Sequence, residues 1–201
     1  SGGNTYRGNT FYESRGTLTL RHGNGTRVEN NLFEGNGAPY TGGIRVINAQ
    51  QTLTNNMFRN LTGTRFSGAL VVMNGVPNSP INRYHQVDGA VIEGNTFDQV
   101  GTIELGEGSD SERSAVPINS RFENNVVIGS LQQTPFNLYD DMSGIAFASN
   151  YTNFDPPAAL ASGFTVLGDD QSAPGTAGAS GTFGIAKSET GVDWYPKPSA
   201  A

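Results

Sequence analysis

Two arginines are the side chains best suited to chemistry on an acidic ligand. Arg21, which His22 follows, ends one short apolar run, and Arg45 lies within the next such run along the chain. If the two runs are neighbouring parallel strands, about 4.8 Å apart, both guanidinium groups can reach the same bound group. Two guanidinium groups on a flat sheet face suit a carboxylate or a sulfate. The sequence therefore indicates a site for an acidic ligand.

The strands that would carry these arginines follow a glycine in four places. Residues 16–22, 42–48, 68–74 and 101–107 align position by position. Their alternation predicts two inward columns, one of Leu18, Ile44, Leu70 and Ile103 and one of Leu20, Val46, Val72 and Leu105. It predicts two outward columns as well, one of Thr19, Arg45, Val71 and Glu104 and one of Arg21, Ile47 and Met73.

Further polar side chains are expected to rim the same cleft. His22, Asn48 and Asn74 occupy the position at which each strand runs into its turn. An alternative for His22 is a hydrogen bond to the turn backbone. Tyr84 and His85 lie in an inserted stretch, residues 74–87, and insertions on one face of a solenoid usually build a binding wall.

The elements that position these residues are predicted from an internal repeat. Its anchor is an asparagine that recurs at spacings of 22 to 39 residues, at Asn9, Asn31, Asn56, Asn95, Asn125 and Asn150. Three residues before the asparagine stand Tyr6, Val28, Leu53, Ile92, Phe122 and Phe147. Two residues after it stand Phe11, Phe33, Phe58, Phe97, Val127 and Thr152. This alternation is typical of one parallel strand per coil.

Short coils with glycine turns and a stacked asparagine predict an all-β, right-handed parallel β-helix of about six rungs. The asparagine side chain can bond the backbone and its equivalents in neighbouring coils. We therefore interpret the six asparagines as structural. The recurring Glu29, Glu93 and Glu123 are interpreted as outward ladder residues.

Composition limits the remaining interpretations. The 201 residues fit one domain, with coils over 1–170 and a Gly, Ala and Ser-rich loop plus C-terminal segment, 171–201, packing on them. Zero Cys excludes disulfides and thiolate chemistry. No apolar stretch reaches the roughly 20 residues of a membrane span, so no membrane partner is expected, nor a nucleic acid.

Charge is divided unevenly along the chain. Residues 1–86 hold eight Arg against three Glu, whereas the whole chain carries a net charge of −6. The first half could therefore hold a polyanion. The alternative is that these arginines decorate a solvated face.

The sequence resembles a known family in residue type and order. The matching segments are 9–11, 13–23, 42–45, 74–75 and 84–87, and the most specific is Leu-Arg-His-Gly at 20–23. They resemble the polysaccharide lyases that include alginate lyases and chondroitinase B. The likeness extends over roughly residues 1–150, and the closing segment 191–195 also looks like the end of such catalytic domains.

The resemblance implies β-elimination on a uronic-acid polysaccharide, alginate or dermatan-type chondroitin, by a secreted or periplasmic enzyme. In the family a lysine removes the C5 proton, an arginine aids the leaving oxygen and calcium neutralises the carboxylate. The resemblance places Arg21 at the position of the family's catalytic arginine, and we expect the adjacent His22 to be catalytic as well. We expect the substrate to be bound by Arg45, Asn74, Tyr84, His85 and Glu13.

The sequence also departs from the family pattern. The lysine precedes the arginine by about one rung, yet the only lysines here are Lys187 and Lys197. We therefore expect the base, the calcium ligands and the first rungs upstream of Ser1, with that upstream part as a partner, and no metal site within the chain. Glu104, Glu107, Asp110 and Glu112 could form a replacement metal site, but a solvated acidic loop is the favoured interpretation.

Two other classes of function remain open. A β-helix with these arginines could bind an acidic glycan without cleaving it, and would then release no unsaturated product. A purely structural solenoid is the second alternative, and the uneven charge distribution counts against it.

Overall fold

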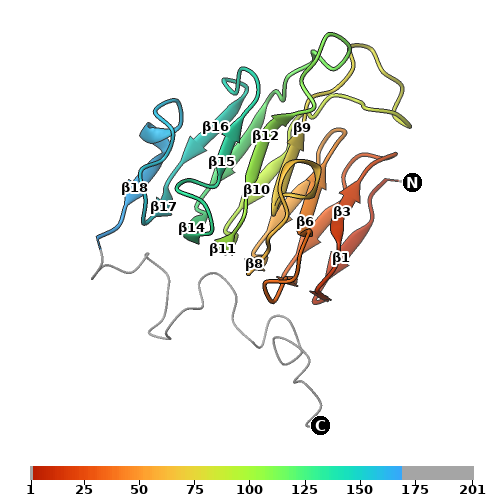
Figure 1. Ribbon diagram of the computed structural model, residues 1–201. Helices are drawn as coiled ribbons and strands as arrows, with labels where there is room; N and C mark the ends of the chain where they lie inside the picture. The colour runs from red at the N-terminus through yellow and green to blue at the C-terminus, as the bar shows by residue number, and fades with distance from the viewer. Residues whose placement is uncertain (1, 169–201) are drawn as a thin grey trace.

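The computed structural model describes residues 2–168, and these residues form a parallel β-helix, as predicted. The coils from β1 to β15 each contribute a strand to all three sheets, and the strands after β15 join sheets A and B alone (Figure 1). Neighbouring strands in each sheet pair in parallel. Two 3-10 helices, η1 (Arg65–Ser67) and η2 (Ala161–Gly163), interrupt the strands. No helix among residues 2–168 is long and apolar enough to cross a membrane. The segment 171–201 lies outside the described residues.

The three sheets differ in the number of strands. Sheet A has six: β1 (Thr5–Arg7), β4 (Arg27–Glu29), β7 (Thr52–Thr54), β10 (Val91–Glu93), β13 (Ser120–Glu123) and β16 (Ile145–Ala148). Sheet B has seven: β2 (Thr10–Tyr12), β5 (Leu32–Glu34), β8 (Met57–Arg59), β11 (Thr96–Val100), β14 (Val126–Ser130), β17 (Asn150–Thr152) and β18 (Phe164–Val166). Sheet C has five: β3 (Gly16–Leu20), β6 (Thr41–Val46), β9 (Leu70–Met73), β12 (Ile103–Glu107) and β15 (Phe136–Leu138).

The asparagine ladder runs through the bend between sheets A and B, which confirms the predicted line. Each Nδ2 donates to the Oδ1 of the next asparagine, from Asn9 to Asn31 at 3.0 Å and on to Asn125 and Asn150 at 3.2 Å. The same amide also donates to a carbonyl oxygen of the preceding coil, as Asn56 does to Val28 at 2.8 Å. Because the inner asparagines are buried, these bonds satisfy groups that the bend removes from the sheets.

A stack of phenylalanines fills the core beside the ladder. Phe11, Phe33, Phe58 and Phe97 stack in sequence with ring centroids 4.5, 4.9 and 4.6 Å apart. They pair in register along sheet B, as the repeat predicts. Because each ring stacks on its equivalent, one coil fixes the height of the next. This regular core is the frame on which sheet C is held.

Candidate active site

The outward face of sheet C carries the predicted arginines in the predicted register. Arg45 pairs with Thr19 of β3 on one side and with Val71 of β9 on the other, and Val71 pairs with Glu104 of β12. The inward neighbours Val46, Val72 and Leu105 belong to the main core. Arg21 follows β3 directly and is exposed. Both arginines therefore project from the same sheet face.

The middle of this face is apolar and is covered by the insertion 74–87. Ile47, Val71 and Met73 are at most 1% exposed although they point outward, and Tyr84 packs against them. Asn48 anchors the insertion, because its Nδ2 donates to the Ile81 carbonyl oxygen at 2.8 Å. The insertion thus forms a wall on the sheet, as expected for a binding site.

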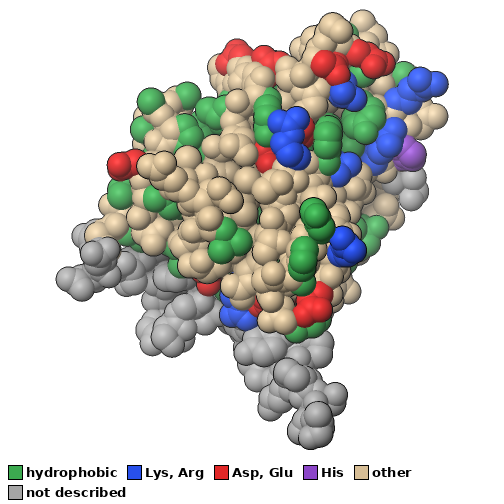
Figure 2. Space-filling view, in the orientation of Figure 1, with side chains coloured by type: hydrophobic (Ala, Val, Ile, Leu, Met, Phe, Trp, Pro, Cys, Tyr) green, Lys and Arg blue, Asp and Glu red, His purple; other side chains and the backbone are tan. Residues whose placement is uncertain are grey.

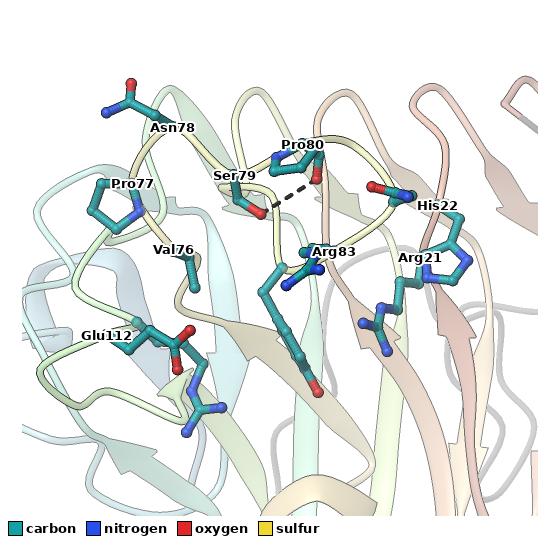
Figure 3. A pocket seen from close by; sticks show the side chains of 12 residues that line it. Arg21, His22, Val76, Pro77, Asn78, Ser79, Pro80, Arg83 and Glu112 are labelled. Carbon is teal, nitrogen blue, oxygen red and sulfur yellow. Dashed lines mark hydrogen bonds between the residues drawn. The ribbon is translucent and has the colours of Figure 1, made fainter.

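A cavity of about 780 Å³ lies between this wall and the end of β3. Figure 3 shows Arg21 and His22 on one side, Val76 and Glu112 on the other, and Arg83 between them. This volume is within the range of sites that hold small ligands or sugar units. Figure 2 shows that arginine side chains, drawn in blue, gather on the half of the molecule that carries the N-terminal coils and these loops. The cavity is therefore suited to an anionic ligand.

Tyr84 connects two of the arginines that line the cavity. The guanidinium carbon of Arg21 lies 4.6 Å from the Tyr84 ring centroid, and that of Arg113 lies 5.6 Å from it. Arg113 is held in turn by the Gly108 carbonyl oxygen, at 2.6 Å from its Nε, and by the Asp110 carboxylate. Cation–π contacts of this kind orient a guanidinium without consuming its donors. Arg21 therefore keeps its N–H groups for a ligand.

Arg45 lies beside the cavity and is partly buried. Its Nε donates to the Phe66 carbonyl oxygen at 3.2 Å, its Nη2 donates to the same oxygen, and its guanidinium carbon lies 5.3 Å from the Phe66 ring centroid. Burial lowers the pKa of Arg45, Tyr84 and Glu107 raise it in part, and the charge of Arg21 lowers it further. An anion bound between the two guanidinium groups would relieve this repulsion.

The acidic end of sheet C corrects the interpretation of a solvated loop. Glu104 and Glu107 are both fully buried, whereas Asp110 and Glu112 are exposed. Glu104 accepts hydrogen bonds from Asn137 and Tyr139, and Glu107 lies 3.2 Å from the Arg65 guanidinium. No pattern in the sequence indicates this burial, because the covering groups of Asn137, Tyr139 and Arg65 come from other coils.

Calcium, which the resemblance implies, does not fit the described residues. Within residues 2–168 no group of three or more His, Cys, Asp or Glu side chains could hold a metal ion. The Glu104 carboxylate is occupied by donors and the Glu107 carboxylate faces a guanidinium, so neither offers calcium the cluster of oxygen ligands that it requires. We assign no calcium-dependent step to this part of the molecule.

Three of the predicted binding residues differ in how they are placed. Tyr84 stands at the cavity, whereas His85 is turned to its own loop, with Nδ1 2.8 Å from the Ser79 carbonyl oxygen. Asn74 does not rim the cleft as expected. It is fully buried, and its Nδ2 donates to Asp140 at 2.8 Å and to the Arg113 carbonyl oxygen at 3.2 Å. Asn74 therefore anchors a loop, as Asn48 does.

Glu13 is the predicted binding residue that lies apart from the cluster. It follows β2, at the opposite end of β3 from Arg21, and five strand residues span about 17 Å. Its Oε1 accepts a hydrogen bond from Asn36 at 2.8 Å. The expectation that Glu13 joins the site is therefore not met, because the length of the strand separates it from Arg21.

Sequence reasoning missed several side chains at this site. Arg83 and Arg113 line the cavity, and Arg65 and Phe66 contact the sheet from η1. All four lie in loops that carry no periodic pattern. The one available signal was position, since Arg83 directly precedes Tyr84 in the insertion.

Comparison with known proteins identifies the family. The family model of chondroitinase B matches residues 1–166. The structure of the alginate lyase AlyGC, of polysaccharide lyase family 6, matches with a TM-score of 0.80 and 47% identity over 100% of this chain. An Arg-to-Ala variant of AlyGC matches with a TM-score of 0.80 and 48% identity over 98% of the chain.

A mannuronic acid specific family 6 lyase from the human gut microbiota is a more distant relative. It matches with a TM-score of 0.72 and 31% identity over 83% of this chain and 39% of its own. This chain spans 29 to 30% of the length of the two AlyGC chains. A comparison with curated proteins found no match. Because the family model matches most of the chain and AlyGC matches all of it, this chain belongs to the chondroitinase B family of polysaccharide lyases.

Proposed function

We propose that this chain contributes the arginines of a polysaccharide lyase site. The site would cleave a uronic-acid polymer by β-elimination, and alginate is the first candidate. The observation that supports it most is the pair Arg21 and Arg45 on one outward face, beside a cavity of about 780 Å³. Alginate is favoured over dermatan-type chondroitin because AlyGC is an alginate lyase and the gut relative is specific for mannuronic acid. Such polymers are extracellular, so we propose a secreted or periplasmic protein.

The proposed roles follow from the charge that develops in the reaction. When a base removes the C5 proton, negative charge passes from the sugar carboxylate towards the departing O4. A guanidinium stays protonated in proteins, so Arg21 would stabilise the leaving oxygen electrostatically. Arg45 would hold the carboxylate, and Tyr84 would support the sugar ring. His22, next to Arg21 on the cavity wall, is the second candidate to contact the leaving group.

The base and the neutralising cation are proposed to come from outside this chain. The only lysines, Lys187 and Lys197, lie outside the described residues, and residues 2–168 offer no calcium ligand cluster. We propose that the base and the ligands of the cation belong to a segment that precedes Ser1. General-base catalysis contributes about 10²–10⁴-fold, so residues 1–201 alone should turn over negligibly.

The test is the ultraviolet absorbance of the 4,5-unsaturated uronate formed from alginate and from dermatan sulfate. We expect no product from residues 1–201 and product when upstream coils are joined to the chain or added as a fragment. Arg21→Ala in the extended protein should lower kcat/KM by about 10²–10³-fold. Arg121→Ala, which removes an exposed arginine from sheet A, is the matched control and should have no effect.

Two outcomes would overturn parts of this proposal. Turnover by residues 1–201 at an ordinary rate of about 1–10³ per second would show that the base is within the chain. An extended protein that cleaves neither polymer, or one whose rate is unchanged by Arg21→Ala, would remove the lyase assignment. Saturable binding of alginate without product would then favour a glycan-binding module.

A further inference from the structure

The turn 64–68 lies against the outward face of sheet C and contacts both of its charged ends. Arg45, Val71 and Glu104 occupy one outward column on successive coils, so Arg45 and Glu104 are about 10 Å apart. Val71 between them is fully buried. Phe66 of the turn contacts Arg45, and Arg65 contacts Glu104. The turn therefore links two side chains that do not touch each other.

At the basic end, the turn fixes one edge of the Arg45 guanidinium. Nε and Nη2 both donate to the Phe66 carbonyl oxygen, and the Phe66 ring lies 5.3 Å from the guanidinium carbon. A guanidinium has five donors in a rigid fork. Holding one edge therefore sets the direction of the other edge, which can take a carboxylate in two parallel hydrogen bonds.

At the acidic end, Glu104 is a buried and fully occupied acceptor. It accepts from Thr102 Oγ1 at 2.6 Å, from Tyr139 Oη at 2.8 Å, from Asn137 Nδ2 at 3.0 Å and from the backbone N–H of Arg65. An ionised carboxylate accepts about four such bonds. The donors of Thr102, Tyr139 and Asn137 fix the position of the carboxylate. The fourth hydrogen bond, from the backbone N–H of Arg65, therefore fixes the turn.

The turn itself needs such an external hold. Arg65 has a φ of 56°, in the left-handed region that is unfavourable for a residue other than glycine. Its guanidinium is held 3.2 Å from Glu107 and 4.6 Å from the Tyr139 ring centroid. A strained conformation persists only where the surroundings enforce it. Here the enforcing contacts come from β12 and from Tyr139 just after β15.

We propose that Glu104 is a positioning residue for the lyase site: through the turn 64–68 it sets the Phe66 carbonyl oxygen, which orients Arg45 towards the substrate carboxylate. The inference rests on the proposed function of Arg45 and assigns to Glu104 no contact with substrate. Its consequence is that a buried carboxylate two coils away controls the recognition of an acidic sugar.

The first test needs no substrate. In the chain labelled with ¹⁵N-arginine, the Arg45 Nε–H should exchange slowly with water because it is bonded to Phe66. Glu104→Gln should speed this exchange at least about tenfold. Glu93→Gln, which neutralises an exposed glutamate on sheet A, is the matched control and should leave it unchanged. Unchanged Arg45 exchange in a folded Glu104→Gln variant would overturn the proposal.

The second test measures binding of an alginate hexasaccharide and of its carboxyl-reduced, neutral form. Arg45→Ala should weaken binding of the acidic form about tenfold, and Glu104→Gln about three- to tenfold. Neither should change binding of the neutral form, which a general loss of structure would weaken as well. The double variant should bind like Arg45→Ala alone, because both changes remove one interaction. Additive losses in the double variant would contradict the proposal.

A further variant keeps the proposal testable if Glu104→Gln does not fold. If Glu104→Gln is not folded by circular dichroism, Glu104→Asp keeps the charge and withdraws the acceptor from the Arg65 N–H, and it should give the same pattern. The two proposals also fail differently. If Arg45→Ala leaves acidic binding unchanged, the proposed function of Arg45 is wrong. If Arg45→Ala weakens binding and neither Glu104 variant does, only the positioning role is wrong.

Discussion

The outward faces of sheets B and C use opposite charges in different ways. On sheet B, Glu34, Arg59 and Asp98 occupy one column on successive coils, and Arg59 Nε lies 2.7 Å from Glu34 Oε2. On sheet C, Val71 separates Arg45 from Glu104. Charges on adjacent coils satisfy each other directly. Charges that are one coil further apart leave the arginine with donors for a ligand.

The difference teaches that spacing along the column, rather than residue type, divides the arginines that are paired with a carboxylate of the fold from those that keep donors for a ligand. Glu34 is 4% exposed and also accepts from the Asn36 backbone N–H at 2.8 Å and from Asn60 at 3.0 Å. Its column is therefore a closed network that stabilises the coils. Arg45 and Arg21 have no carboxylate within salt-bridge distance among residues 2–168, which is the condition for binding an acidic sugar.

The sharpest way to break this comparison is Arg59→Ala. It leaves the nearly buried Glu34 carboxylate without its cation, and we expect a loss of about 2 kcal/mol in the free energy of unfolding, less than for a fully buried pair because Arg59 is partly exposed. Urea denaturation measures it. Binding of an alginate hexasaccharide should not change. Weaker hexasaccharide binding with full stability would mean that sheet B, too, takes part in recognition.

The periodic part of the molecule could be predicted from the sequence, because a repeated contact leaves a repeated residue. The asparagine ladder, the phenylalanine stack and the columns of sheet C follow from spacing alone. Arg45 was placed correctly for the same reason, since its neighbours in the strand alternate. For a residue in a strand of the repeat, the alternation of the strand determines whether its side chain points inward or outward.

The loops could not be predicted, because their conformation depends on contacts with coils far away in sequence. Asn74 and Glu104 are held by Arg113, Asp140 and Tyr139, which lie 35 to 66 residues away. The left-handed backbone conformation at Arg65 could not be predicted either, because such a conformation is usually indicated by a glycine and this position holds an arginine. Strand pattern predicts which face a side chain takes, but not which loop then covers that face.

A smaller effect on the sheet C side comes from Tyr84. Tyr84→Ala removes the ring between Arg21 and Arg113 and uncovers Ile47, so hexasaccharide binding should weaken about tenfold while stability falls by about 1–2 kcal/mol. Tyr84→Phe keeps the ring and should retain nearly full stability. Calorimetric titration and thermal unfolding separate the two effects. Equal binding losses for both variants would show that the hydroxyl, and not the ring, matters.

The smallest predicted effect concerns Asp98, the last charge of the sheet B column. Burial raises the pKa of Asp98 above its ordinary value of 3.8, the charge of Arg59 lowers it in part, and that of Glu34 raises it. The folded protein therefore holds this proton to a higher pH than the unfolded chain does. Asp98 lowers stability as the pH rises through its folded pKa, and has no effect below 3.8, where both states are protonated.

Asp98→Asn removes this pH dependence, so the variant should be more stable than the parent at pH 7, by less than about 1 kcal/mol, and equal to it below pH 3.8. Urea denaturation at both pH values measures the difference, with the exposed Asp155→Asn as control. Because Arg59 holds the pKa of Asp98 down, the gain should be larger in an Arg59→Ala background. The same gain in both backgrounds would mean that the sheet B charges do not act as one network, and the contrast with sheet C would then rest on Glu34 and Arg59 alone.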